Sequence, residues 1–331
     1  MTSRLIAGAA IFLCAVSTSL AIDLERPDVE TFIDRMAQQH HYDRNDLRDI
    51  LGQADSKKSI IEKISKPAEK TLSWADYRPI FLTRERIRAG ANFWRENREM
   101  LDEISNDTGV PNEIVVGIIG VETYFGRITG NHRVLDALAT LAFDYPPRAE
   151  FFRRELEEYL LLIREEEMRA TDAIGSYAGA MGRPQFMPSS FRAYAVDSTG
   201  DGKRDIWTNW ADVVGSISNY FLAHGWQPGQ EITTQAILGS GWRGPPPVPA
   251  NTLQAEDTVG SLSRKGVLFA TELAADSESQ LLTLDGSIGP EHWVGFHNFF
   301  VITRYNRSVM YALAVHQLGL EIALEIKLGD S

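Results

Sequence analysis

One glutamate is distinguished by its position at the end of a long apolar run. Glu122 is the first charged residue after Glu113, and residues 114–120 are all aliphatic or glycine. Such a run predicts a helix that is buried on every side. The apolar surroundings and the negative end of the helix dipole both favour the protonated carboxyl, as a general acid working near neutral pH requires. The alternative is a structural glutamate that reaches solvent or pairs with Arg127 or Arg133.

Acid-assisted cleavage of a glycosidic bond usually requires a second carboxylate, and the sequence near Glu122 offers no good candidate. Asp136 and Asp144 follow it, but Asp136 falls in the apolar stretch 134–141 and fits a structural role equally well. A single acid suffices when a group of the substrate supplies the nucleophile. The residues therefore leave a one-carboxylate mechanism open.

A second group of oxygen-bearing residues has the spacing of an ion-binding loop. Asp197, Thr199 and Asp201 precede Gly202, as in the first half of an EF-hand loop, and Lys203 can contribute its backbone carbonyl. Thr208 stands where a bidentate glutamate is expected, and Asp212 can take that role slightly later. The alternative is an Asp-Gly turn held by hydrogen bonds between side chains and backbone. The ion expected here is structural and weakly bound, and these residues do not distinguish Ca²⁺ from Na⁺.

These candidate residues lie in a chain whose first half is predicted to be helical. Pro27 begins an amphipathic run, and two short helices are expected over 43–53 and 57–65. Thr83 is a plausible N-cap for a long helix that ends near residue 105, and Pro111 is placed as the first residue of the helix carrying Glu122. Pro146 and Pro147 introduce a further helix with many charged residues.

The second half of the sequence is more mixed. Residues 172–208 are rich in Gly, Ser, Pro and Asp, and long loops of this kind in compact domains are usually functional. A helix is predicted over 210–224, a rigid loop over 241–249, and a last helix over 308–327. Short strands are predicted over 281–284, 293–296 and 299–303. The expected fold class is mainly α with a small β part (α+β).

Composition limits the kinds of partner and the compartment. The 331 residues carry a net charge of −12 and one cysteine, which argues against a nucleic-acid partner and excludes an internal disulfide or a Cys-rich zinc site. Arg4, the apolar run 5–16 and Ser19-Leu20-Ala21 predict a signal peptide over 1–21, cleaved after Ala21. The alternative is an uncleaved anchor. Because no later run of eighteen apolar residues exists, the exported product is expected to be soluble and periplasmic, without a permanent membrane anchor.

Several blocks of sequence stand out over about 110–318. They are Gly120-Val121-Glu122-Thr123 with Gly126, Leu135-Asp136-Ala137-Leu138-Ala139-Thr140-Leu141, Gly175-Ser176-Tyr177-Ala178-Gly179-Ala180-Met181-Gly182, Gln185-Phe186-Met187-Pro188-Ser189-Ser190, Asn219-Tyr220-Phe221, His224-Gly225-Trp226, and Ile302-Thr303-Arg304-Tyr305-Asn306. In this order along the chain, they resemble the motifs of the lytic murein transglycosylase B family (glycoside hydrolase family 103). Arg183-Pro184 departs from the small residues usual in the family at that point. The first hundred residues fit more loosely.

The resemblance implies a lysozyme-like catalytic core flanked by α-rich lobes. The division is an N-terminal lobe over about 22–108, a core with the ion loop over about 109–230, and a C-terminal lobe over about 231–331 that completes the groove. The family cleaves the β-1,4 bond between N-acetylmuramic acid (MurNAc) and N-acetylglucosamine (GlcNAc) in peptidoglycan without adding water. It leaves 1,6-anhydro ends on MurNAc.

The resemblance also assigns roles to residues. Glu122 is the acid and then the base, and the chemistry requires no cofactor. Ser176 and Gln185 are the polar contacts around the reacting sugar. Further residues are implied to line the groove: Tyr220, Tyr305 and Asn306, with Phe186 and Met187 as apolar contacts to sugar rings. The alternative for Tyr220 and Phe186 is that both are core aromatics. The family has a calcium loop with a late aspartate, which favours Asp212 as the last ligand.

Three functions follow from these observations. The first is a lytic transglycosylase that acts on peptidoglycan glycan strands, and the second is a muramidase that hydrolyses the same bond. The third is a cell-wall-binding protein without turnover, against which the retention of Glu122, Gln185 and Asn306 argues. The sequence does not identify protein partners.

Overall fold

The computed structural model describes residues 20–65 and 72–329. All but the last two residues of the predicted signal peptide, 1–21, lie outside this range. Those two form β1 (Leu20–Ala21), which pairs with β2 (Asp55–Ser56). The cleavage site after Ala21 therefore stays a prediction.

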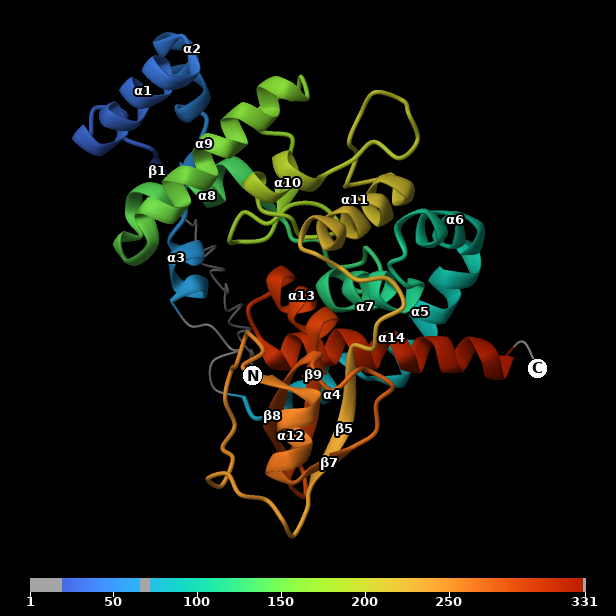
Figure 1. The fold of residues 1–331 in the computed structure, drawn as a ribbon. Helices are drawn as coiled ribbons and strands as arrows, with labels where there is room; N and C mark the ends of the chain where they lie inside the picture. The colour runs from blue at the N-terminus through green and yellow to red at the C-terminus, as the bar shows by residue number, and fades with distance from the viewer. Residues whose placement is uncertain (1–19, 66–71, 330–331) are drawn as a thin grey trace, which may run out of the picture.

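The N-terminal helices pack against helices from the middle of the chain. The predicted amphipathic run from Pro27 forms α1 (Pro27–His40), and the two predicted short helices are confirmed as α2 (Arg44–Leu51) and α3 (Lys58–Ile64). They lie beside α8 (Val134–Asp144) and α9 (Ala149–Glu165), which follows the 3₁₀ turn η2 (Pro146–Arg148) (Figure 1). The Arg26 guanidinium joins the two groups through the Asp144 carboxylate at 2.5 Å. This lobe therefore draws on residues from two separate parts of the chain.

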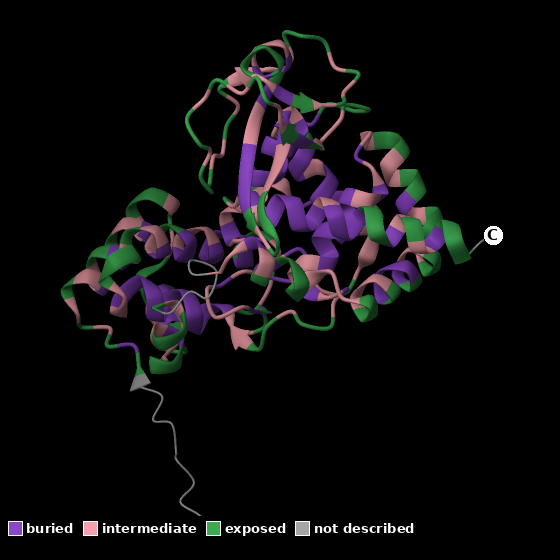
Figure 2. Ribbon diagram, turned by 90° about the horizontal axis from the view of Figure 1, so that it is seen from below, coloured by how far each residue is buried: buried purple, intermediate pink, exposed green. Residues whose placement is uncertain are grey.

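Two apolar helices cross at the centre of the molecule. They are α7 (Asn112–Thr123) and α14 (Val309–Gly329), and the buried residues gather around them (Figures 1 and 2). Their backbones approach closely at two glycines. A Cβ on Gly117 would lie only 2.4 Å from the Val315 carbonyl oxygen, and a Cβ on Gly319 only 2.1 Å from the Glu113 carbonyl oxygen. Pro111 was predicted to be the first residue of α7. It is the N-cap, and the helix begins one residue later, at Asn112.

Three further helices cover this pair: α4 (Trp74–Phe81), α5 (Arg84–Glu96) and α6 (Arg98–Thr108). Thr83 caps α5 as predicted, since its side chain accepts from the Arg86 N–H. The single helix expected up to residue 105 is wrong. It is broken at Asn97, whose φ of −118° and ψ of 19° turn the chain and separate α5 from α6.

The glycine-rich middle of the chain is mostly loop. The short strands β3 (His132–Arg133) and β4 (Ile174–Gly175) pair at its start, and α10 (Pro188–Tyr194) interrupts it. α11 (Trp210–Ala223) follows, close to its predicted bounds. The loop thus lies between α7 and α11, over the C-terminal end of α7.

A five-stranded antiparallel sheet forms the β part. Its order is β6 (Asp257–Thr258), β8 (Glu278–Gly286), β9 (Gly289–Phe296), β5 (Thr233–Leu238) and β7 (Val267–Phe269), with α12 (Val259–Lys265) against one face. The strands predicted over 281–284 and 293–296 are confirmed within β8 and β9, where Leu282 pairs with Trp293. The strand predicted over 299–303 is wrong, because this segment belongs to α13 (His297–Tyr305). The fold class, mainly α with a small β part, is confirmed.

α14 is long and apolar enough to cross a membrane by length and composition alone. However, 56% of its most apolar window is buried inside the fold. Its apolar residues pack on α7 and α5, as in a core helix.

Candidate active site

Glu122 lies in the last turn of α7, as predicted. The residues from Ile114 to Gly120 are buried, whereas Glu122 is only partly buried. The helix ends directly after it, because Tyr124, Phe125 and Gly126 adopt left-handed backbone angles with φ of 50°, 57° and 79°. Its carboxyl group is therefore fixed at a helix end where the chain turns away from the core.

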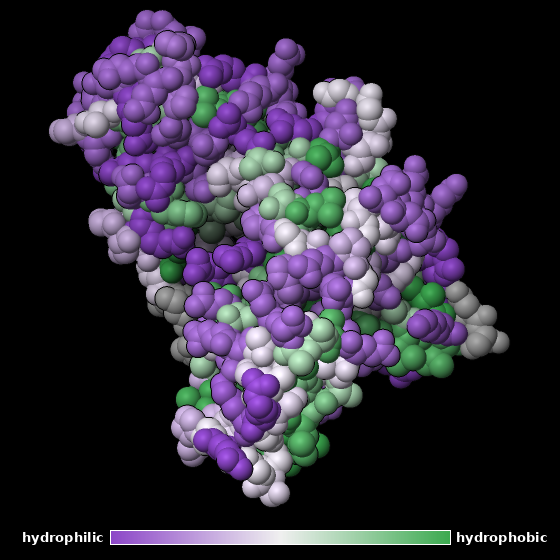
Figure 3. Space-filling model, in the orientation of Figure 1, coloured by the Kyte–Doolittle hydropathy of each residue, from purple (hydrophilic) through white to green (hydrophobic). Residues whose placement is uncertain are grey.

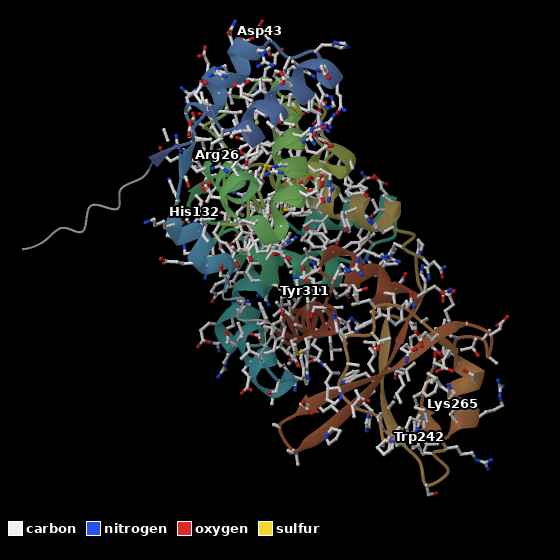
Figure 4. The ribbon with its side chains drawn as sticks, turned by 90° about the vertical axis from the view of Figure 1, so that its left-hand side faces the viewer. Arg26, Asp43, His132, Trp242, Lys265 and Tyr311 are labelled. Atoms are coloured by element: carbon white, nitrogen blue, oxygen red, sulfur yellow. The ribbon has the colours of Figure 1, made fainter. Side chains whose placement is uncertain are left out.

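The hydroxyl of Tyr311, from α14, donates to Glu122 Oε1 at 2.5 Å. Tyr311 is 2% exposed and lies near the centre of the molecule in Figure 4. Burial, followed by the nearby charge of Glu122, raises the pKa of Tyr311 well above its usual range. The phenol therefore stays protonated and acts as a donor to the carboxyl. The sequence analysis did not single out this residue.

A second tyrosine connects the glutamate to the glycine-rich loop. The Tyr305 hydroxyl, at the end of α13, donates to the Pro184 carbonyl at 2.7 Å. Burial raises the pKa of Tyr305 well above its usual range, and the charge of Glu122 adds to the effect. Tyr305 thus lies near Glu122 and holds the backbone next to Gln185.

The loop from Gly175 to Met187 is shaped by its own hydrogen bonds. Ser176 Oγ accepts from the backbone N–H groups of Ala178 and Ala180, at 3.2 and 3.1 Å. Gln185 has a φ of 54°, and its Nε2 donates to the carbonyls of Thr129 and Gly182, at 3.2 and 2.8 Å. The Gln185 amide is therefore fixed by its nitrogen, which leaves its oxygen as the atom that can accept from a sugar hydroxyl.

Arg183, the departure from the family motif, points away from this group. Its guanidinium lies 3.8 Å from the centre of the Trp210 ring and donates to the Thr208 carbonyl at 2.8 Å. Its own backbone carbonyl accepts from the Thr123 hydroxyl at 3.1 Å. The loop is thereby tied to the residue that follows Glu122.

The two predicted aromatic residues lie below the surface. Phe186 is 2% exposed and Tyr220 8%, and their ring centres lie 5.8 Å apart. The Tyr220 hydroxyl donates to the Arg304 carbonyl at 2.7 Å, next to Tyr305. Both rings pack against the ring of Tyr305. Met187, in contrast, is partly exposed.

Asn306 lines a neighbouring cavity of about 430 Å³. Trp74, Asn251 and Asp285 are among its other walls, so helix α4, a loop and the sheet all contribute. Figure 3 shows a hollow on this side of the molecule, between the lobe of α1 to α3 and the body that contains α13. The predicted site residues thus divide into a group around Glu122 and an adjoining wall at Asn306.

The residues considered as ion-pair partners of Glu122, or as a second catalytic carboxylate, make other contacts. Arg133 pairs with Asp136 at 2.7 Å and with Asp55 at 3.1 Å, and the Arg127 guanidinium lies 4.9 Å from the centre of the Tyr124 ring. Asp136 is fully buried between Arg133 and Lys57. Asp136 and Asp144 therefore hold the N-terminal lobe together, as structural partners.

The predicted ion loop is closed by its own aspartates. Asp197 accepts four hydrogen bonds from within the loop, and its pKa is lowered by them, most of all by the Gly202 N–H. The fully buried Asp212 accepts from the backbone N–H groups of Ser198 and Asp205, at 2.9 and 2.8 Å. Within the described residues no group of three or more His, Cys, Asp or Glu side chains is arranged to hold a metal ion.

The oxygen donors of the loop nevertheless suit a hard cation by type. Thr199 and Asp201 are exposed on the same turn, and Asp201 Oδ1 accepts from the Lys203 N–H at 2.9 Å. Carboxylate, hydroxyl and carbonyl oxygens are the ligands that Ca²⁺ prefers.

Comparisons with known proteins agree with this geometry. The family model described as "Transglycosylase SLT domain" matches residues 25–320. The chain is 41% identical over 307 residues to membrane-bound lytic murein transglycosylase B of Escherichia coli (strain K12), covering 90% of this chain and 83% of that protein.

Two solved structures are similar over most of their length. Catenated lytic transglycosylase SltB1 from Pseudomonas aeruginosa is 45% identical with a TM-score of 0.84, covering 91% of this chain and 98% of that one. Escherichia coli Slt35 in complex with calcium is 40% identical with a TM-score of 0.82, covering 93% and 97%. The chain therefore belongs to the transglycosylase SLT domain family and is a lytic transglycosylase, a peptidoglycan-cleaving enzyme with a lysozyme-like core.

Proposed function

We propose that Glu122 carries out both proton transfers of the lytic reaction on peptidoglycan. The protonated carboxyl gives its proton to the oxygen that bridges MurNAc and GlcNAc while the bond from that oxygen to C1 of MurNAc breaks. The resulting carboxylate then takes the proton of the MurNAc 6-hydroxyl as O6 bonds to C1. The products are a 1,6-anhydro-MurNAc end and a free GlcNAc hydroxyl, and no water is consumed.

The observation that carries this proposal is the setting of the Glu122 carboxyl. It ends a buried helix and accepts a hydrogen bond from Tyr311 at 2.5 Å, while the two nearest candidate carboxylates in sequence are engaged in the N-terminal lobe. A single acid is sufficient when the substrate supplies its own nucleophile. The group can therefore serve as acid in one step and as base in the next.

We propose that the sugar contacts come from the loop and the wall around this carboxyl. Ser176, Gln185 and Met187 are assigned to the ring that reacts, and Asn306 to the adjoining cavity. Tyr220, Tyr305 and Phe186 hold these residues in place from below. Asn306 follows Tyr305 and lines a cavity of about 430 Å³, which supports a further contact for the glycan strand beside the reacting sugar.

Mass spectrometry of digested peptidoglycan tests the reaction. The wild-type protein is expected to release fragments with anhydro ends, and Glu122→Gln is expected to release none. Reducing ends from the wild type would identify a muramidase, and intact glycan with both proteins would identify a cell-wall-binding protein. Glu113→Gln, at the other end of α7, is the matched control and should retain anhydro products.

We also propose that the loop over 197–205 holds a structural Ca²⁺. The ligands would be Asp197, Thr199, Asp201 and the Lys203 carbonyl, with Asp212 as the last ligand. The oxygen-only donor set supports a hard cation, and the solved calcium complex of Slt35 supports Ca²⁺ over Na⁺. The ion would stabilise the loop and take no part in proton transfer.

We further propose that the protein acts in the periplasm after export. The predicted signal over 1–21 supports this location, and so does the membrane-bound lytic murein transglycosylase to which the chain is similar. The division into lobes over 22–108, 109–230 and 231–331 likewise stays a prediction.

A further inference from the structure

The proline-rich loop between β5 and β6 contacts the start of α14. It spans residues 239–256 and has prolines at positions 245, 246, 247 and 249, which restrict its backbone. Its later part, Pro249, Ala250 and Asn251, forms one wall of the 430 Å³ cavity that Asn306 also lines. The loop therefore belongs to the sheet lobe but lies beside the proposed sugar contacts.

The side chain of Asn251 holds the turn between α13 and α14. Its Oδ1 accepts from the backbone N–H of Val309 at 2.8 Å, and its Nδ2 donates to the Arg307 carbonyl at 2.9 Å. Val309 is the first residue of α14, and the N–H groups of a first helical turn have no acceptor within their own helix. Asn251 thus caps α14 from 58 positions away in the chain.

The turn that Asn251 holds joins the helices that carry Tyr305 and Tyr311. Tyr305 is the last residue of α13, and Tyr311 lies in the first turn of α14. Within the turn, the Ser308 N–H donates to the Asn306 carbonyl at 2.7 Å, and the Tyr311 N–H donates to Ser308 Oγ at 3.2 Å. A shift of this turn would therefore move the Tyr311 hydroxyl relative to Glu122 Oε1.

We propose that Asn251 is a positioning residue for the proton transfers at Glu122. It fixes the start of α14 and thereby holds the Tyr311 hydroxyl against Glu122 Oε1. This inference rests on the proposed function, in which the carboxyl that accepts from Tyr311 transfers the proton. Both polar atoms of the Asn251 amide are engaged by backbone groups, so the residue acts through α14 and not by bonding to the sugar.

The cap of α2 provides a matched control for this role. Asp43 Oδ1 accepts from the N–H groups of Asn45 and Asp46, at 2.7 and 3.2 Å, and both Asp43 and Asn251 are exposed. Asp43 lies at the far end of the N-terminal lobe, away from Tyr311 (Figure 4). If Asn251 only stabilised a helix, Asn251→Ala and Asp43→Ala should behave alike at Glu122.

The pKa of the Glu122 carboxyl, measured without substrate, tests the proposal. The measurement is a pH titration by NMR of full-length protein labelled with ¹³C at the glutamate carboxyl carbon, in which Glu122→Gln identifies the resonance. Because a donated hydrogen bond favours the ionised carboxyl, Asn251→Ala should raise this pKa by about half a unit, in the same direction as Tyr311→Phe. Asp43→Ala should leave it unchanged.

Turnover gives a second readout, in the form of a double-mutant cycle. Asn251→Ala should lower kcat for the release of anhydro products by about five-fold in the parent protein, and by less than about two-fold in the Tyr311→Phe background. Asp43→Ala should leave kcat unchanged.

Two results would overturn the positioning role of Asn251. They are an unchanged Glu122 pKa in Asn251→Ala, and equal losses of kcat in the parent and Tyr311→Phe backgrounds. Retention of anhydro products by Glu122→Gln would instead contradict the proposed function. The pKa measurement needs no turnover, so it would still report whether Asn251 holds Tyr311 against the carboxyl.

Discussion

Tyr311 Oη and Glu122 Oε1 lie 2.5 Å apart although 189 positions separate the two residues in the chain. The contact lies about one turn beyond the place where Gly117 and Gly319 allow the antiparallel helices α7 and α14 to approach closely. The phenol is buried and its raised pKa keeps it protonated, so its hydroxyl can donate to the Glu122 carboxylate. Packing of the two core helices therefore determines the orientation of the proposed acid.

Tyr311→Phe tests this arrangement. The ring still fills its site, but a hydrogen bond to a charged group, worth about 1.5–3 kcal/mol, is lost. We expect kcat to fall by about ten- to a hundred-fold, with KM nearly unchanged. Because a donated hydrogen bond favours the ionised carboxyl, the basic limb of the kcat profile should also move to higher pH.

Tyr159→Phe is the matched control for this variant. Tyr159 is also fully buried, and its hydroxyl donates to the Ala170 carbonyl at 2.7 Å, within the N-terminal lobe. Its replacement should lower stability and leave kcat and the pH profile intact. An equal loss of kcat in both variants would show that Tyr311 acts only through the stability of the fold.

Glu122 could be found from the sequence because its signal is local. A charged residue at the end of an apolar run is visible in a few consecutive letters, and so is the spacing of the loop over 197–205. Tyr311 was missed because its partner lies on another helix, and an apolar stripe hides a buried hydroxyl. A tyrosine within a fully buried helix face is itself a signal, since its hydroxyl must find an acceptor.

The errors in secondary structure have a similar origin. The segment 299–303 is short, aliphatic and aromatic, and a buried strand and a buried helix have the same pattern over such a length. It is helical because α13 is buried between the sheet and α14. The break at Asn97 was missed because no proline or glycine marks it.

Gly319→Ala tests the contact between α7 and α14. Alanine normally favours a helix by about 1 kcal/mol, but a Cβ at 2.1 Å from the Glu113 carbonyl oxygen must push the helices apart. We expect a net loss of about 2 kcal/mol in the free energy of unfolding, measured in urea, together with a lower kcat. Gly241→Ala is the control, because its Cβ would meet nothing within 4 Å. Equal stability of the two variants would contradict the close approach.

Removal of calcium tests the ion loop. If the loop binds Ca²⁺ only when folded, calcium at about ten times its Kd should stabilise the protein by about 1.4 kcal/mol. Thermal melting should therefore shift upward with CaCl₂ and return with a chelator. Asp201→Asn should abolish the shift, whereas the exposed Asp276→Asn should retain it. A shift that survives in Asp201→Asn would place the ion elsewhere.

Asp136→Asn tests the junction between the N-terminal lobe and the core. The fully buried carboxylate contacts Lys57 Nζ at 2.6 Å and Arg133 Nη2 at 2.7 Å, so its neutralisation removes the charge that both cations share and leaves Arg133 with Asp55 alone. We expect a loss of about 3 kcal/mol in the free energy of unfolding. Asp172→Asn removes a solvent-exposed pair with Arg169 and should have little effect. Similar losses in both variants would argue against a special role for the buried carboxylate.

His316 makes the stability of the fold depend on pH. Burial lowers the pKa of His316 to about 4, below its usual value of 6.5, and its Nδ1 has no partner among the described residues. The imidazole of His316 binds a proton more readily in the unfolded chain than in the fold. The free energy of unfolding is therefore not reduced by His316 above about pH 6.5, and it decreases as the pH falls towards 4. Between pH 7 and pH 5 the loss in the free energy of unfolding is about 2 kcal/mol.

Urea unfolding at several pH values tests this. The His316→Leu variant should lack this loss of about 2 kcal/mol, whereas the control His41→Asn, at an exposed position, should retain it. A decline of the same size in His316→Leu would assign the pH dependence to other groups.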